Sequence, residues 1–172
     1  MSTAAPTLND VNIGAVAGLA GKIIDEPTVA ATQWRAQVTW KGAFRSESQV
    51  RDFVPVPSDE PVGLGGTDTA ANPVEQLLSA LGNCLAVGYA ANATVAGIEI
   101  DDLSIDLEGD LDLHTFLGLS DGNAGYDAIR VKVNLKSNAS AEQLAALHEK
   151  VTGTSPVGHT LSRAVPVRIE LA

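Results

Sequence analysis

The sequence contains only one cysteine, Cys84, among 172 residues. A single thiol cannot form a disulfide within the chain, so the cysteine content gives no indication of an oxidising compartment. Aromatic residues make up only 4% of the chain, and the core must therefore be built mainly from Ala, Val, Leu and Ile. With 45% hydrophobic and 19% charged residues, the composition is nevertheless that of an ordinary globular domain.

Basic residues are also few, with 11 Lys and Arg against 21 Asp and Glu and a net charge of −10. Because nucleic acids and anionic membrane surfaces are bound through clustered Lys and Arg, we expect neither as a partner. Polar residues interrupt the uncharged stretch 76–98, so it is not expected to span a membrane. The N-terminus MSTAAPTLNDV does not have the pattern of a secretory signal, and we expect a soluble cytoplasmic protein.

Several common catalytic and metal-binding motifs are absent. There is no G-x-S-x-G nucleophile elbow, and GLGGTD lacks the Gly-Lys-Ser/Thr ending of a phosphate-binding loop. One cysteine and three scattered histidines do not have the spacing of zinc ligands. The sequence therefore predicts no metal site and no bound cofactor.

Hydrophobic periodicity predicts helices and strands that occur in groups. Helical spacing or helix caps predict helices at 11–24, 72–96 and 141–151 and a short helix that begins at Ser155-Pro156. Apolar–polar alternation predicts strands at 33–40, 45–53, 101–113, 128–136 and 165–171, and the Pro- and Gly-rich segment 54–73 is predicted to be a loop. This grouping is typical of an α+β fold with a largely antiparallel sheet. Acidic residues on the outer face of 101–113 and basic residues on that of 128–136 predict cross-strand ion pairs.

The helix that carries Cys84 has clear start signals. Asn72 is a candidate N-cap, Pro73 suits the first helical position, and Glu75 in the first turn complements the helix dipole. The helix is apolar on most of its circumference, which predicts that it is buried. Steps of three and four place one stripe of residues on a shared face: Leu77, Leu81, Cys84, Gly88, Ala91 and Val95.

Three segments, GGTDTAANPVEQLLSALGNCLAVGYA, GIEIDDLSIDLEGDL and TGTSPVGHTLSRAVPVRIEL, resemble in order and spacing the OsmC/organic hydroperoxide resistance (OsmC/Ohr) family. The resemblance covers roughly residues 34–172, so we expect an N-terminal extension with a helix at 1–32 and an OsmC-like domain at 33–172. It implies an intertwined homodimer in which largely antiparallel sheets wrap around long central helices.

The resemblance also implies a thiol chemistry. Peroxidatic members of the family reduce organic hydroperoxides with a reactive cysteine on the central helix, and Cys84 matches that position. A second cysteine at the start of a later helix then forms a disulfide with the first, and a small dithiol recycles the enzyme. Here the position of the second cysteine is occupied by Ser155, which excludes a two-cysteine cycle.

In the family, an arginine and a glutamate polarise the reactive thiol. The position of the glutamate holds Val74 in this sequence, and Glu75 follows about 100° further around the helix. The segment DEPVGLGGTD, where the arginine is expected, contains none, so the candidates are Arg45 and Arg51 further upstream. Without a nearby cation, a thiol with an ordinary pKa of about 8.5 is mostly protonated at neutral pH and is a weak nucleophile.

Each candidate residue also has a structural interpretation. Cys84 can be a small core residue, Ser155 a helix N-cap, and Glu75 an acid that complements the helix dipole. His159 lies one helical turn after Ser155, so it could act as a base in the same cavity as Cys84 or be a surface histidine. His148, on a predicted amphipathic helix, is interpreted as an ordinary surface residue.

The sequence leaves two functional hypotheses. In the first, the protein is an OsmC-like stress-response protein in which Cys84 acts as a weak one-cysteine scavenger of organic hydroperoxides or electrophiles, recycled by an external dithiol or another thiol. In the second, a non-catalytic protein binds a small hydrophobic ligand in the same dimer-interface pocket. In both hypotheses Val74, Ser155 and His159 line the pocket.

Overall fold

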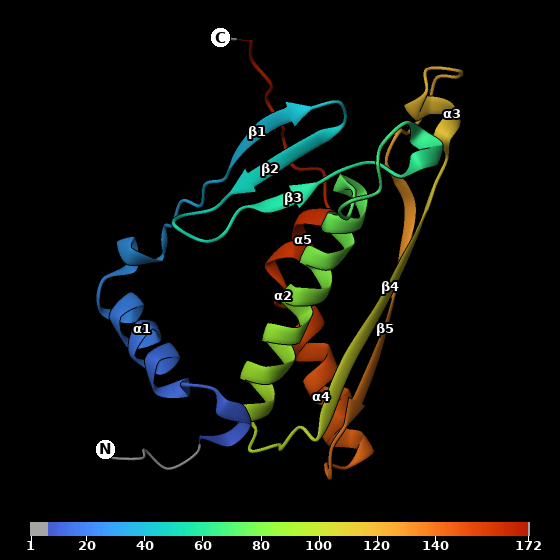
Figure 1. Ribbon diagram of the computed structural model, residues 1–172. Coiled ribbons are helices and arrows are strands. Elements are labelled where there is room, and N and C mark those ends of the chain that lie inside the picture. Colours follow the sequence, from blue (N-terminus) through green and yellow to red (C-terminus); the bar gives the residue numbers. More distant parts are fainter. Residues whose placement is uncertain (1–6, 172) are drawn as a thin grey trace. The chain divides into compact units, whose positions relative to one another are not determined.

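The computed structural model describes residues 7–171 and has an α+β architecture (Figure 1). The helices are α1 (Ile13–Asp25), α2 (Pro73–Val95), α3 (Leu113–Phe116), α4 (Ala141–Thr152) and α5 (Pro156–Leu161). The strands are β1 (Gln37–Gly42), β2 (Arg45–Gln49), β3 (Val56–Ser58), β4 (Asp102–Leu111) and β5 (Tyr126–Lys136). The chain divides into two compact units, Gly14–Leu77 and a second unit that joins the residues before Gly14 to those from Leu78 onward. The predicted domain boundary after residue 32 stays a prediction.

The unit of residues 14–77 contains a three-stranded antiparallel sheet in the order β1-β2-β3. The first two strands were expected from the alternating pattern, and the turn between them matches the segment KGAF. The third strand was missed, because it lies within the Pro-rich segment that predicts a loop. Pro57 is tolerated there because β3 lies at the edge of the sheet, where the missing N–H is not needed for a second neighbour.

Asp59 organises the long loop between β3 and α2. Its side chain is buried, and its carboxylate accepts hydrogen bonds from the hydroxyls of Thr67 (2.5 Å) and Thr69 (3.0 Å). The backbone N–H groups of Glu60, Thr67 and Thr69 donate to the same carboxylate. These bonds, above all the one from the Thr67 hydroxyl, hold the pKa of Asp59 well below its ordinary value. The loop is therefore folded around an ionised carboxylate.

Acid should weaken this loop. Because the pKa of Asp59 is depressed in the folded chain, its stabilising contribution is fully present above the unfolded pKa of about 3.9 and is lost as the pH falls through the lower folded pKa. We expect Asp59→Asn to destabilise the protein at neutral pH and to flatten the acid limb of the unfolding free energy, measured by urea titration from about pH 6 down to about pH 2. Asp68→Asn, at an exposed position of the same loop, is the control. An unchanged acid limb in Asp59→Asn would contradict this account.

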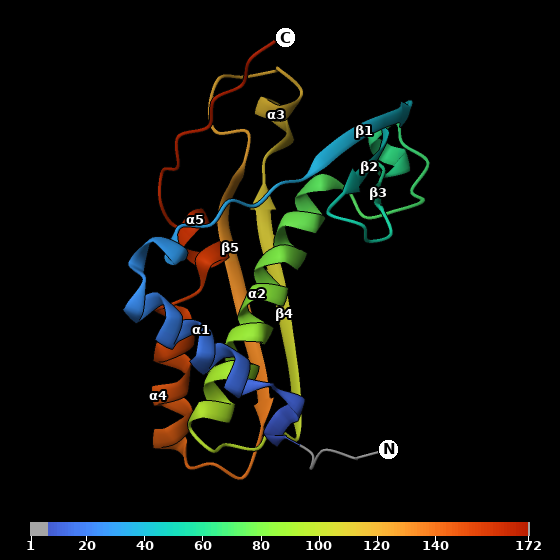
Figure 2. The same cartoon turned by 90° about the vertical axis from the view of Figure 1, so that its left-hand side faces the viewer.

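The second unit is built on a hairpin of β4 and β5, paired antiparallel from Asp102↔Lys136 to Leu111↔Tyr126. The part of α2 from Leu78 onward runs along this hairpin together with α4 and α5 (Figure 2). Half-buried apolar residues of both strands pack against a buried cluster in which α2 contributes every fourth residue. The cluster consists of Leu81, Leu85, Tyr89, Ala93, Ile98, Leu147 and Val151.

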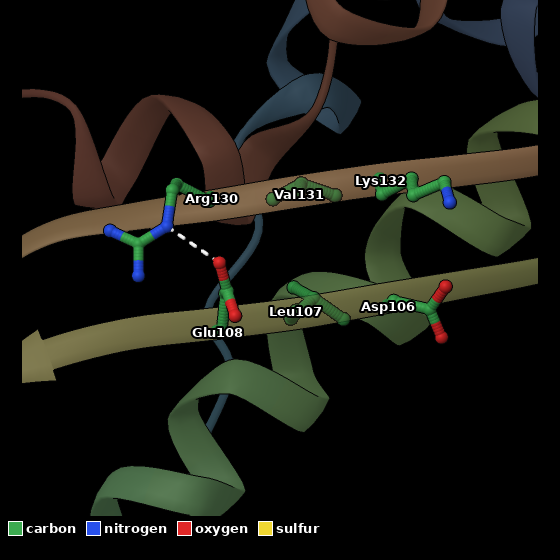
Figure 3. A pocket seen from close by; sticks show the side chains of 6 residues that line it. All are labelled: Asp106, Leu107, Glu108, Arg130, Val131 and Lys132. Atoms are coloured by element: carbon green, nitrogen blue, oxygen red, sulfur yellow. Dashed lines mark hydrogen bonds and ion pairs between the residues drawn. The ribbon is translucent and has the colours of Figure 1, made fainter.

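The other face of the hairpin carries the predicted cross-strand charges. Glu108 faces Arg130 and Asp106 faces Lys132 in the strand register, and the side chains of both pairs border a shallow hollow of about 280 Å³ (Figure 3). Arg130 donates to Glu108 at 2.7 Å and also to Asp110, and its guanidinium holds the pKa of Asp110 below the ordinary value. The prediction of cross-strand ion pairs is confirmed for Arg130 with Glu108 and Asp110, whereas Asp106 accepts a hydrogen bond from Asn134.

Two apolar surfaces of this unit are exposed, contrary to the sequence predictions. Residues 165–171 are not paired as a strand, and Val167 and Ile169 are 78% and 92% exposed. The helix α2 is buried along one face only, with Val87 and Val95 about 70% exposed (70% and 71%). The alternation in 165–171 suits a strand, but a strand needs a hydrogen-bonded neighbour, and the described part of this single chain pairs none with it.

The segment before α1 is fixed to the second unit by Asn9. The Asn9 amide donates to the Thr94 hydroxyl at 3.0 Å and to the Ile98 carbonyl at 2.9 Å, and its oxygen accepts from the Ile100 N–H at 2.9 Å. Asn9 has φ of +54°, a left-handed conformation in which Asn is enriched among non-glycine residues. One side chain thus satisfies backbone groups of the turn between α2 and β4.

Candidate functional site

The start of α2 is held by a reciprocal pair of hydrogen bonds. The Asn72 side chain accepts from the Glu75 N–H, and the Glu75 carboxylate accepts from the Asn72 N–H, both at 2.9 Å. This capping box confirms the predicted N-cap and gives Glu75 a structural role at the helix start. Val74, which occupies the position of the family's glutamate, lies half-buried in the same turn.

Cys84 and Ser155 are brought together from positions 71 residues apart. The Cys84 Sγ lies 3.3 Å from the Ser155 Oγ, and either group can be the donor. Ser155 is buried at the N-cap of α5, where its Oγ also accepts from the Gly158 N–H at 3.1 Å. Pro156 occupies the first helical position, as the Ser-Pro sequence predicts. The Ser155 hydroxyl therefore both caps α5 and contacts the Cys84 thiol.

For the remaining predicted site residues, His159, Arg45 and Arg51, the structure gives positions but, among the described residues, no side-chain hydrogen bond to Cys84 or Ser155. His159 lies on α5 with an exposed side chain, and its ring makes no hydrogen bond to another residue within 7–171. Arg45 begins β2, and the Arg51 guanidinium lies over the Phe53 ring at 4.4 Å. Both arginines belong to the unit of residues 14–77, whereas Cys84 belongs to the other unit. Their predicted roles stay predictions.

A cavity of about 300 Å³ lies between β5 and α5, and its lining includes neighbours of Cys84 and Ser155 but neither of these two residues. Its walls include Gly158, whose N–H bonds to Ser155, and Leu81, which precedes Cys84 by one turn of α2. Ile129 and Leu161 add apolar surface. The cavity has the size of a small-molecule site, and its lining combines these apolar side chains with Asp127 and Ser162.

The buried Tyr89 contacts His148, which lies at an exposed position of α4, and sequence reasoning missed this contact. Tyr89 is 2% exposed, its hydroxyl hydrogen-bonds the His148 Nδ1, and the two rings stack with centroids 6.2 Å apart. Burial raises the pKa of Tyr89, so the phenol is neutral at physiological pH. The sequence carried a local signal for the burial of Tyr89, which continues the buried stripe of Leu81 and Leu85 at steps of four, but none for its contact with His148.

Neither a metal cluster nor a membrane span is found in the part of the chain that the structure describes. Between residues 7 and 171, no group of three or more His, Cys, Asp or Glu side chains could hold a metal ion. Among the helices of the same residues, none combines the length and the apolar character needed to cross a membrane.

Comparison with known proteins gives a family match that includes both Cys84 and Ser155. Residues 66–170 match the family model described as OsmC-like protein. A curated relative, the uncharacterized protein YmaD of Bacillus subtilis (strain 168), is 30% identical over 113 residues, which span 64% of this chain and 71% of YmaD.

Solved structures show the same fold at low sequence identity. An OsmC-like protein from Mycoplasma pneumoniae aligns with a TM-score of 0.66 and 18% identity over 76% of this chain and 88% of its own. An organic hydroperoxide resistance protein OsmC from Legionella pneumophila aligns with a TM-score of 0.56 and 17% identity over 76% and 91%.

The α+β fold with its long helix α2 and the family match over more than half of the sequence define the class of the protein: the chain belongs to the OsmC-like family. The resemblance and the fold class predicted from the sequence are thereby confirmed.

Proposed function

We propose that the protein is a stress-response thiol protein that reduces organic hydroperoxides slowly through Cys84. The observation that supports this most directly is the 3.3 Å contact between the Cys84 thiol and Ser155, the residue at the position of the family's second cysteine. The organic hydroperoxide resistance proteins among the structural neighbours point to the same substrate class. The cavity between β5 and α5, with Leu81, Ile129 and Leu161 in its lining, supports an organic substrate rather than hydrogen peroxide.

The proposed reaction begins with the thiolate of Cys84. Its sulfur attacks the terminal oxygen of the hydroperoxide, the O–O bond breaks, and the alkoxide leaves as an alcohol after taking a proton. Cys84 is then a sulfenic acid, which an external thiol converts to a mixed disulfide with release of water. A second thiol, such as the other sulfur of a dithiol, attacks this disulfide and restores Cys84. Ser155 donates a hydrogen bond to the thiolate and, having no sulfur, leaves the second step to the external thiol.

The test combines a thiol titration with a peroxide assay. We expect cumene hydroperoxide to be consumed in the presence of an external dithiol by the natural protein and not by Cys84→Ala, because Cys84 is the sole thiol. Glu142→Ala, at an exposed position of α4, is the control and should keep the activity within about twofold, since surface substitutions have small effects. An apparent thiol pKa above about 9, well over the ordinary 8.5, together with no peroxide consumption would reject the reductase.

The same titration decides between the two candidate arginines. A guanidinium near the sulfur favours the thiolate, so its removal raises the thiol pKa and slows the reaction with peroxide. Arg45→Met and Arg51→Met are therefore compared with the natural protein in the same pH series. Equal titration curves for all three proteins would exclude both arginines from the site.

The alternative function is non-catalytic binding of a small hydrophobic ligand beside Cys84. It is favoured by the cavity of about 300 Å³ lined in part by Leu81 and Leu161. In that case Cys84→Ala retains the ligand, and neither protein consumes peroxide. The peroxide assay and a ligand-retention assay by mass spectrometry therefore separate the two functions.

We further propose that the protein is a homodimer. Two exposed apolar surfaces support this assembly, namely the face of α2 that carries Val87 and the alternating segment 165–171. Surfaces of this kind commonly mark a protein interface. A second copy would supply both a packing partner for α2 and a hydrogen-bonded neighbour for 165–171.

Light scattering tests the dimer through one charge placed on α2. Val87→Asp should shift the mass from two chains to one, because burying an unpaired carboxylate in an apolar interface is costly. Leu119→Asp is the matched control, since Leu119 is exposed to a similar degree, 71% against 70% for Val87, but lies in a loop. A mass of one chain for the natural protein would contradict the proposal.

A further inference from the structure

A second cavity lies between the C-terminal end of α2 and the helix α4. It has a volume of about 300 Å³ and is lined mainly by apolar side chains, including those of Val95, Ile98, Ala146 and Leu147. Asn92, on the same wall, follows Cys84 by eight residues, which is about 12 Å along the helix at 1.5 Å per residue. This cavity shares no lining residue with the one between β5 and α5.

The charge of this cavity differs from that of the chain as a whole. Although the chain carries a net charge of −10, the lining contains no carboxylate and one cation, Lys150. The ion pairs found across residues 7–171 do not include Lys150. In contrast, the hollow on the outer face of the hairpin holds Glu108 and Arg130 already paired with each other. An anionic group in the cavity would therefore contact the Lys150 ammonium and would meet no carboxylate among the lining residues.

The other polar groups of the lining are engaged within the protein. The Asn92 amide donates to the Gly88 carbonyl at 2.8 Å, and the Gln143 side-chain oxygen accepts from the Ser140 N–H in the capping box of α4. Lys150 is therefore the polar group best able to bind the head of a ligand. The apolar walls, with Val95 largely exposed, would be covered by its tail.

From this arrangement we propose that the cavity binds a small apolar monocarboxylate, such as a medium-chain fatty acid. The carboxylate accepts a charge-assisted hydrogen bond from Lys150, and the hydrocarbon chain lies over Val95, Ile98 and Leu147. A volume of about 300 Å³ is at the lower end of the range for small-molecule pockets, which limits the ligand to a short or medium chain. A longer chain would extend out of the cavity into solvent.

Calorimetric titration of the full-length protein with octanoate and with 1-octanol tests the site. Lys150→Gln should weaken octanoate binding about tenfold and leave 1-octanol binding unchanged, because only the carboxylate uses the ammonium. Lys132→Gln is the matched control, since Lys132 lies on the outer face of the hairpin. Ala146→Trp, which fills the cavity from the exposed side of α4, should weaken both ligands at least tenfold.

The outcomes that overturn the proposal are equally specific. Octanoate binding that is absent, that is insensitive to Lys150→Gln, or that survives Ala146→Trp would each reject the site. If Ala146→Trp does not fold by circular dichroism, Ala96→Trp fills the same cavity from the end of α2. Cys84→Ala should bind octanoate like the natural protein, so this proposal and the thiol chemistry fail independently.

Discussion

Ser155→Cys should give Cys84 a disulfide partner within the chain. The Sγ of Cys84 and the Oγ of Ser155 are 3.3 Å apart, so a sulfur at position 155 needs to move by only about 1 Å to reach the S–S bond length of about 2.05 Å. We expect one equivalent of cumene hydroperoxide to produce an intrachain disulfide in this variant. A loss of two hydrogens by mass spectrometry and the disappearance of both free thiols measure it.

The same variant should turn over faster with dithiol than the natural protein does. An intramolecular second thiol is present at an effective concentration far above that of an external one, so resolution should accelerate by at least about 100-fold. Ser162→Cys, one residue beyond the end of α5, is the matched control and should form no disulfide with Cys84. Two free thiols remaining in Ser155→Cys after oxidation would show that the two side chains do not meet in solution.

Tyr89→Ala should have the largest effect on stability. The Tyr89 side chain is 2% exposed and lies in the buried cluster between α2 and α4, so its removal leaves a cavity and an unpaired His148. Truncation of a buried aromatic residue costs about 3–5 kcal/mol, which is a large part of the stability of a typical domain. The free energy of unfolding from urea titration measures the loss.

A matched variant separates packing from the hydrogen bond. Tyr89→Phe keeps the ring and its contact with His148 but removes the hydroxyl, and it should cost about 1 kcal/mol. A loss of similar size in Tyr89→Ala and Tyr89→Phe would mean that the hydroxyl rather than the ring stabilises this region. A loss under about 1 kcal/mol in Tyr89→Ala would mean that the cluster around α2 repacks freely.

The elements predicted correctly from the sequence are those set by local signals. The helices α2, α4 and α5 start at Asn72, Ser140 and Ser155, whose side chains accept hydrogen bonds from the first turn. The hairpin of β4 and β5 follows from alternation in both strands and from their opposite charges. Caps and periodicity act over a few residues, so the sequence is sufficient to identify them.

The features that were missed depend on residues far apart in the chain. The strand β3 exists because β2 offers an edge, and residues 165–171 are unpaired because the described chain offers them none. The contact between Tyr89 and His148 joins two helices across 59 residues. No local pattern specifies such partners, and prolines around β3 even argued against a strand.

For the candidate site, sequence motifs predicted which elements carry the residues but not which side chains make contact. The sequence placed Cys84 on the long helix and Ser155 at a helix start, but their 3.3 Å contact is a property of the fold. Glu75 was correctly interpreted as a first-turn acid, and its reciprocal bond with Asn72 became evident only from the structure. Arg45 and Arg51 lie in no motif, so the sequence had no means of ranking them.

Asn9 changes what a minimal folded version of this protein must contain. Although the family match begins at residue 66, a chain shortened to that match would leave the Ile98 carbonyl and the Ile100 N–H without their partner. The turn after the central helix would then rely on water, and amide hydrogen exchange there should become faster. The family match shows which residues resemble relatives in sequence, whereas the hydrogen bonds of Asn9 show that a stable fold also needs a residue outside that match.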